Sequence, residues 1–114
     1  MKKKLDKIFY GLWSCAEDVF GNDYNGFYVP EEDQKNIEFI FASYEYEDYS
    51  GYAFAVFIKD GKLYEINESH CSCNGLEHWE PEETSVIALM SRPNVPSEAK
   101  ANLKQIYKNV MCFL

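Results

Sequence analysis

The pair Asp60-Gly61 constrains the fold of this chain more than any other feature of its sequence. An Asp-Gly pair tolerates the positive φ angles of a tight two-residue turn between antiparallel strands. The residues on both sides of it are rich in apolar and β-branched types, and those from 52 to 58 are nearly all apolar, as in a central strand covered on both faces. The pattern predicts a hairpin with strands at about 52–59 and 62–68.

A third strand is expected before the hairpin, at about 37–46, because Ile37, Phe39 and Phe41 alternate with their neighbours. The N-terminal residues follow a different period. Apolar side chains recur there in steps of three and four from Leu5 to Phe20, which predicts an amphipathic helix. Gly11 inside that helix lowers its stability and lets another element approach closely.

Two further helices are expected toward the C-terminus. Acidic residues suit the first turn of a helix, so Glu82 and Glu83 after Pro81 predict a helix at 82–91, with Val86, Ile87, Leu89 and Met90 inward. Ser97 is a good N-cap for a last helix. The expected fold is α+β: an N-terminal helix, an antiparallel meander of three or more strands, and two C-terminal helices packed on the sheet.

The length of 114 residues is typical of one domain, so residues 1–114 are expected to form a single unit. No apolar run approaches the ~18 residues that a membrane span needs. Lys2, Lys3 and Lys4 are followed by charged residues rather than by a secretory apolar region. We therefore expect a soluble cytoplasmic protein with no membrane contact.

The formal net charge is −8, and the acidic residues are concentrated in the middle of the chain. The stretch 17–48 has ten acidic residues and one lysine, and 63–91 has six acidic residues with no lysine or arginine. Such charge repels phosphate, which disfavours direct nucleic-acid binding. It favours a basic partner, such as a protein that handles nucleic acid. The alternative is a surface whose charge serves only solubility.

Both histidines and two of the four cysteines lie within the segment 70–78. Thiolate and imidazole are the ligands that zinc prefers, and a cytoplasmic protein disfavours disulfides. The preferred set is Cys71, Cys73 and His70. The fourth ligand is left open among His78, Glu77 and Asp48. We expect a closed structural zinc site, the alternative being free thiols and structural histidines.

A cysteine nucleophile with a histidine base is the catalytic alternative for the same segment. Glu68 and Glu77 count against it, because neighbouring carboxylates raise the pKa of a thiol whereas reactive thiolates need positive charge nearby. The sequence has no Gly-rich phosphate loop and no nucleophile elbow. We therefore expect a protein that is not an enzyme.

The segment 46–84 carries a resemblance to a known group of proteins. Its core is Ser69-His70-Cys71-Ser72-Cys73, then Gly75-Leu76-Glu77, then Trp79-Glu80-Pro81-Glu82-Glu83-Thr84. This core, with the Asp60-Gly61 hairpin before it, resembles a family of short acidic proteins from bacteriophages and prophages. Within such small phage proteins the chain looks like the anti-CRISPR inhibitors of type II effector nucleases, which include a zinc-containing member.

The resemblance implies a stoichiometric inhibitor that binds a basic type II CRISPR effector nuclease in the host cytoplasm and blocks DNA loading. Tyrosine and tryptophan are frequent interface anchors. The contact candidates are therefore acidic residues and the aromatic residues near them, namely Tyr44, Tyr46, Tyr49, Trp79, Glu82 and Glu83. For each tyrosine the alternative is an ordinary place on the sheet. A host-takeover adaptor that binds another bacterial protein remains a second hypothesis for function.

Overall fold

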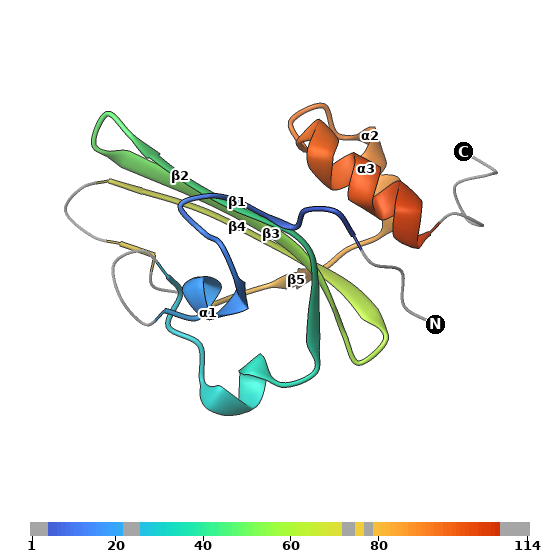
Figure 1. The fold of residues 1–114 in the computed structure, drawn as a ribbon, viewed down its shortest axis with the longest axis horizontal. Coiled ribbons are helices and arrows are strands. Elements are labelled where there is room, and N and C mark those ends of the chain that lie inside the picture. The colour runs from blue at the N-terminus through green and yellow to red at the C-terminus, as the bar shows by residue number, and fades with distance from the viewer. Residues whose placement is uncertain (1–4, 22–25, 72–74, 77–78, 108–114) are drawn as a thin grey trace.

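The computed structural model describes residues 5–21, 26–71, 75–76 and 79–107. They form an α+β fold around a five-stranded sheet in the order β1-β2-β3-β4-β5 (Figure 1). The strands are β1 (Phe9–Gly11), β2 (Ile37–Glu47), β3 (Ser50–Lys59), β4 (Lys62–Cys71) and β5 (Glu82–Glu83). The helices are α1 (Ala16–Val19), the 3₁₀-helix η1 (Glu31–Gln34), α2 (Val86–Ser91) and α3 (Ser97–Ile106). The α+β class expected from the sequence is confirmed.

The predicted hairpin and meander are present. Asp60 and Gly61 have φ angles of 51° and 80° and join β3 to β4, with Lys59 paired to Lys62. Both φ values lie in the region that an Asp-Gly turn of this type requires. Strands β2, β3 and β4 pair antiparallel in chain order, so the centre of the sheet follows from local sequence.

The predicted N-terminal helix is wrong. Residues 9–11 form strand β1, which pairs parallel with β2, so the sheet is mixed rather than purely antiparallel. Only residues 16–19 are α-helical in this region. Gly11 decides the difference, because its φ is +70° and a Cβ built on it would lie 2.2 Å from the Tyr44 carbonyl oxygen. The close approach expected at Gly11 is real, but the element that approaches is a neighbouring strand.

A bulge in β2 changes which residues face which side of the sheet. The pairing register with β3 shifts between Phe39 and Phe41. Phe39 therefore packs on one face, while Ile40 and Phe41 both pack on the other. The simple alternation expected for Phe39 and Phe41 fails at this point, since a bulge inserts one extra residue and reverses the phase.

The polar group that supports this bulge is Asn102 of α3, which is only 6% exposed. Its Nδ2 donates to the Ile40 carbonyl at 2.8 Å and to the Lys7 carbonyl at 2.9 Å. One side chain thus satisfies two backbone acceptors from two segments. The contact ties the N-terminal segment, β2 and α3 together.

Glu82 and Glu83 form β5 beside Tyr64 and Glu65, so the predicted helix at 82–91 is shorter than expected. Helix α2 begins at Val86, and its N-cap Ser85 accepts a hydrogen bond from the Ala88 amide at 3.1 Å. Glu82 and Glu83 are residue types that suit the first turn of a helix, but they do not cap this one. The helix begins only after Ser85, because the Ser85 side chain accepts the hydrogen bond of a first-turn amide.

Two details of the predicted helices are also corrected. Ile87 is 61% exposed and does not face inward. Ser97 is the first residue of α3, and the cap position belongs to Pro96. Proline before the first turn is compatible with a helix start because no backbone amide is needed there.

The sheet separates two groups of buried side chains. Helices α2 and α3 cover one face, where Leu89 and Leu103 pack against Phe54 and Val56. The other face is covered by the segment that contains α1 and by residues 26–30, with Trp13 and Phe27 fully or almost fully buried. Figure 1 shows these elements on opposite sides of the sheet. Among the described residues, no helix has the length and apolar character needed to cross a membrane.

Candidate functional site

Most of the predicted zinc ligands lie outside what the structure describes. Cys73, Glu77 and His78 are not among the described residues, and Cys71 is placed only as the last residue of β4. The side chains of His70 and Asp48 are placed. Within the described residues, no three His, Cys, Asp or Glu side chains come together in a way that could hold a metal ion. The zinc site stays a prediction.

His70 lies on β4 in a row with Gly51 of β3 and Tyr46 of β2. The imidazole rests over Gly51, where a Cβ would come within 2.4 Å of the His70 Nε2 atom. The ring centroid is 5.8 Å from that of Tyr46. Glycine at position 51 therefore makes room for the histidine ring, a role that the sequence pattern did not reveal.

Tyr44 holds the other side of the imidazole. Its hydroxyl oxygen and the His70 Nε2 are 2.7 Å apart and share a hydrogen bond. The Tyr44 side chain is fully buried, and its ring centroid lies 5.5 Å from that of Trp13. Because Tyr44 is fixed in the core, it positions His70 at the edge of the core. A fully buried ring does not offer a docking surface, so Tyr44 is not part of the outer face expected to contact a partner.

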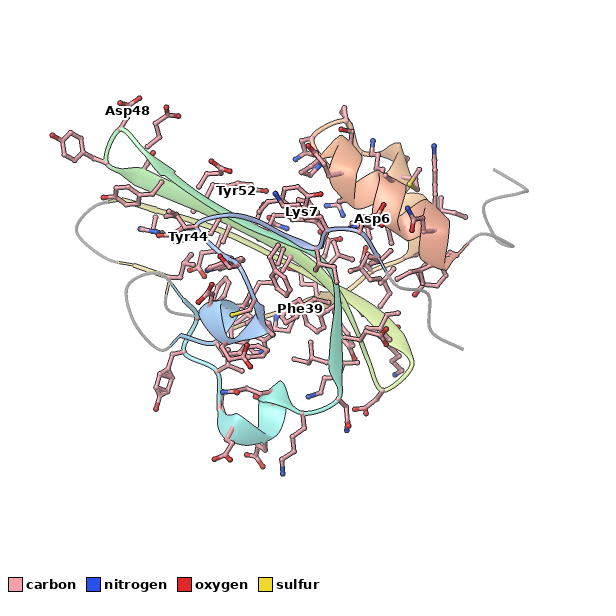
Figure 2. All side chains as sticks on the ribbon, viewed as in Figure 1. Asp6, Lys7, Phe39, Tyr44, Asp48 and Tyr52 are labelled. Atoms are coloured by element: carbon pink, nitrogen blue, oxygen red, sulfur yellow. The ribbon has the colours of Figure 1, made fainter. Side chains whose placement is uncertain are left out.

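The tip of the β2–β3 hairpin is the most exposed part of this region. Asp48 and Tyr49 form the turn, with φ angles of 52° and 65°, and Tyr49 is 78% exposed. Figure 2 shows Asp48 at the free end of the hairpin, away from the core in which Tyr44 lies. Tyr46, two residues before Asp48, is 40% exposed. Glu45 and Glu47 are exposed as well. This hairpin tip, residues 45–49, thus combines carboxylates with accessible tyrosines.

Trp79 has a different environment from the tyrosines of the tip. Its ring packs edge-on against Phe20 and Phe27 and stacks with Phe57, at centroid distances of 5.7, 5.4 and 5.4 Å. It also lines a cavity of about 240 Å³ with Lys59 and Pro81 among its neighbours. Trp79 therefore helps to close one face of the sheet. Glu82 and Glu83 are both exposed on β5.

An ion pair between a buried glutamate and a partly exposed arginine, on the opposite face, was not anticipated from the sequence. Glu65 of β4 is 8% exposed and accepts a hydrogen bond from Arg92, the only arginine in the chain. Asn67 Nδ2 donates to the same carboxylate at 3.3 Å. Beside them, burial raises the pKa of Tyr52 above its usual 10.0, Arg92 lowers it and Glu65 raises it. Glu65 between Tyr64 and Ile66 was the only sign of this pair in the sequence.

The acidic stretch 17–48 does not form one patch. Glu31, Glu32 and Asp33 lie on η1, before β2 begins, whereas the acidic residues of the hairpin tip lie where β2 ends. An 11-residue strand separates the two groups, which corresponds to roughly 35 Å at the usual rise per residue. The acidic residues of η1 and those of the hairpin tip therefore lie at opposite ends of β2.

Comparisons with protein-family models, with curated proteins and with solved structures find no match to this chain. The resemblance to phage proteins therefore stays a prediction that depends on its sequence motif.

Proposed function

We propose that this protein is a phage-encoded inhibitor of the anti-CRISPR kind, which binds a basic type II CRISPR effector nuclease in the host cytoplasm and blocks DNA loading. The observation that carries the proposal is the hairpin tip, where the exposed carboxylates of Glu45, Glu47 and Asp48 alternate along the chain with two exposed tyrosines, Tyr46 and Tyr49. Carboxylates complement a groove built to hold phosphate, and exposed tyrosines supply contact area.

In this proposal the protein acts stoichiometrically rather than as a catalyst. The net charge of −8 accelerates the encounter with a basic nuclease through long-range attraction. The hairpin tip then occupies surface that DNA would otherwise contact.

We further propose that zinc fixes the segment after β4, with Cys71, Cys73 and His70 as ligands and one of His78, Glu77 and Asp48 as the fourth. The Tyr44–His70 hydrogen bond fits this assignment, since zinc-binding histidines usually share their other ring nitrogen with an outer partner. When bound, zinc would supply a cross-link that needs no disulfide in a reducing compartment.

The test is DNA cleavage by a guide-loaded type II nuclease titrated with the protein. The double variant Glu45→Lys/Glu47→Lys should weaken inhibition at least tenfold. Its matched control, Glu31→Lys/Glu32→Lys, changes the net charge equally at the other acidic end and should weaken inhibition less. Equal loss of inhibition in both variants would show that net charge alone is responsible, and would contradict a specific role of the hairpin tip.

The tyrosines are tested in the same way. Tyr49→Ala should weaken inhibition, whereas Tyr28→Ala removes a ring that is 66% exposed elsewhere and should have little effect. A nuclease that the wild-type protein neither binds nor inhibits would contradict the inhibitor proposal. Affinity capture from infected host cells, with a tagged copy, would then identify the bacterial protein that an adaptor binds.

A further inference from the structure

Among the described residues, no strand pairs with β1 on the side away from β2. In a parallel pair, alternate residues direct their backbone groups to the same neighbour. Here Ile8 and Leu12 hydrogen-bond to β2, at 2.9 Å in both cases. Phe9 and Gly11 are the alternate residues, and in the described part of the chain no hydrogen bond joins their backbone groups to another residue. Two amides and two carbonyls therefore line the outer edge of the sheet.

A groove follows the same edge. A cavity of about 420 Å³ is lined entirely by the segment that contains β1, with Asp6 at one end and Ser14 at the other. Asp6 and Lys7 lie on the side of α3, where Asn102 holds the Lys7 carbonyl (Figure 2). Leu12, next to the groove in sequence, is 54% exposed. The edge thus offers free backbone groups, a concave surface and an exposed apolar side chain together.

The charges around this groove are mainly acidic. Asp6 lines it directly, and the Glu45 carboxylate reaches to 3.0 Å from the position of a Cβ on Gly11. Asp18 lies beside its far end, where it accepts a hydrogen bond from the Ser14 amide at 2.7 Å. The ammonium of Lys7 is directed to the Tyr10 ring, 4.6 Å from its centroid.

We propose that this groove binds an extended, basic segment of the partner protein, which adds to the sheet as a sixth strand beside β1. Strand addition takes affinity from main-chain hydrogen bonds and selectivity from the side chains that flank them. A three-residue edge is too short to pair indiscriminately, so the flanking carboxylates select the segment. A second copy of this chain is a poorer occupant, because each copy carries a net charge of −8. The inference rests on the proposed function and specifies how that partner is bound.

A matched pair of variants at Phe9 tests the edge. Phe9→Pro removes the outward amide and places a ring carbon there, but it leaves the β1–β2 hydrogen bonds intact. Phe9→Ala loses the same aromatic contact with Phe39, at a centroid distance of 5.7 Å, and keeps the amide. Both variants lose the phenyl ring, so a difference in binding between them reports the free edge.

Binding to a guide-loaded type II nuclease is measured for the full-length chain and both variants, together with hydrogen exchange of the Phe9 and Gly11 amides. We expect Phe9→Pro to bind about tenfold more weakly than Phe9→Ala, as the loss of one or two hydrogen bonds requires. In the wild-type protein, both amides should exchange rapidly when free and slowly in the complex.

The outcomes separate the two proposals. Tight binding with equal affinity of both variants and unprotected amides would overturn strand addition and leave the inhibitor proposal standing. No binding by the wild-type protein would overturn both. A concentration-dependent dimer that Phe9→Pro abolishes and Phe9→Ala retains would show that the edge pairs with a second copy, which would overturn the basic segment as its occupant.

Discussion

Replacing Gly11 with alanine should detach β1 from the sheet. The residue has φ +70°, and the new Cβ would meet the Tyr44 carbonyl oxygen at 2.2 Å. Backbone atoms of a central strand cannot move aside cheaply, so the β1–β2 contact must open. The hydrogen bond from the Leu12 amide to the same Tyr44 oxygen, 2.9 Å long, is lost as it opens.

The magnitude follows from three costs and one smaller gain. A left-handed backbone costs a non-glycine residue about 1–2 kcal/mol. Loss of the Leu12 hydrogen bond costs about 1 kcal/mol. The backbone shift that makes room for the new Cβ costs about 1–3 kcal/mol more. The lower entropy of an unfolded chain with alanine returns about 0.4–1 kcal/mol. The free energy of unfolding should therefore fall by about 4 kcal/mol.

The assay is urea unfolding of both proteins followed by tryptophan fluorescence, with Gly61→Ala as the matched control. Gly61 also has positive φ, at 80°, but no atom lies within 4 Å of a Cβ built there. That control should lose only about 1 kcal/mol, from the backbone conformation alone. Equal losses in the two variants would refute the steric argument. A gain of stability in Gly11→Ala would refute the strand itself, because alanine stabilises a helix interior by about 1 kcal/mol over glycine.

Three further predictions concern other parts of the molecule. Asn102→Leu should lower the free energy of unfolding by about 2–4 kcal/mol in the same urea assay, because the Ile40 and Lys7 carbonyls lose their shared donor; a loss below about 0.5 kcal/mol would contradict this. The raised pKa of Tyr52 means that the folded state holds the phenol proton more tightly than the unfolded state, whose pKa is 10.0, so stability should decline as pH rises above 10.0. Tyr52→Phe should make that decline shallower, measured by unfolding at pH 9 to 11, and an unchanged slope would count against burial as the cause. If zinc is bound, Cys71→Ser/Cys73→Ser should lower the melting temperature and the zinc content, whereas Cys15→Ser, which changes a free thiol on the N-terminal segment, should leave the zinc content unchanged; absence of zinc from the wild-type protein would exclude the site.

The centre of the fold could be predicted from sequence because its information is local. The Asp60-Gly61 turn fixes the β3–β4 register by itself, and the apolar run before it identifies a strand covered on both faces. The N-terminal segment is different. Its apolar spacing suits a helix, but pairing with β2 and the positive φ of Gly11 depend on residues about 30 positions away. Tertiary contacts therefore override a local pattern there.

The sequence predicts which segment holds the candidate site, but not which residues from other strands contact it. The residue types between 70 and 78 predict a zinc site, but they do not show that a tyrosine from another strand holds His70. Nor does a glycine at position 51 indicate which ring will lie over it. Both contacts depend on the register of three strands, in which Tyr46, Gly51 and His70 share a row and Tyr44 lies two residues from that row on β2. Register is set by the hairpin turns, so it becomes visible only once these are placed.

The separation of the acidic residues changes how charge contributes to the proposed binding. Charges on η1 and on the hairpin tip lie roughly 35 Å apart along β2, which is several times the ~8 Å screening length at physiological ionic strength. The two ends therefore act independently once a partner is close, and only the end in contact affects dissociation. Both ends still contribute to the attraction that governs association at low salt. Added salt should thus slow association of the wild-type protein, whereas charge reversal at the contacting end alone should also speed dissociation.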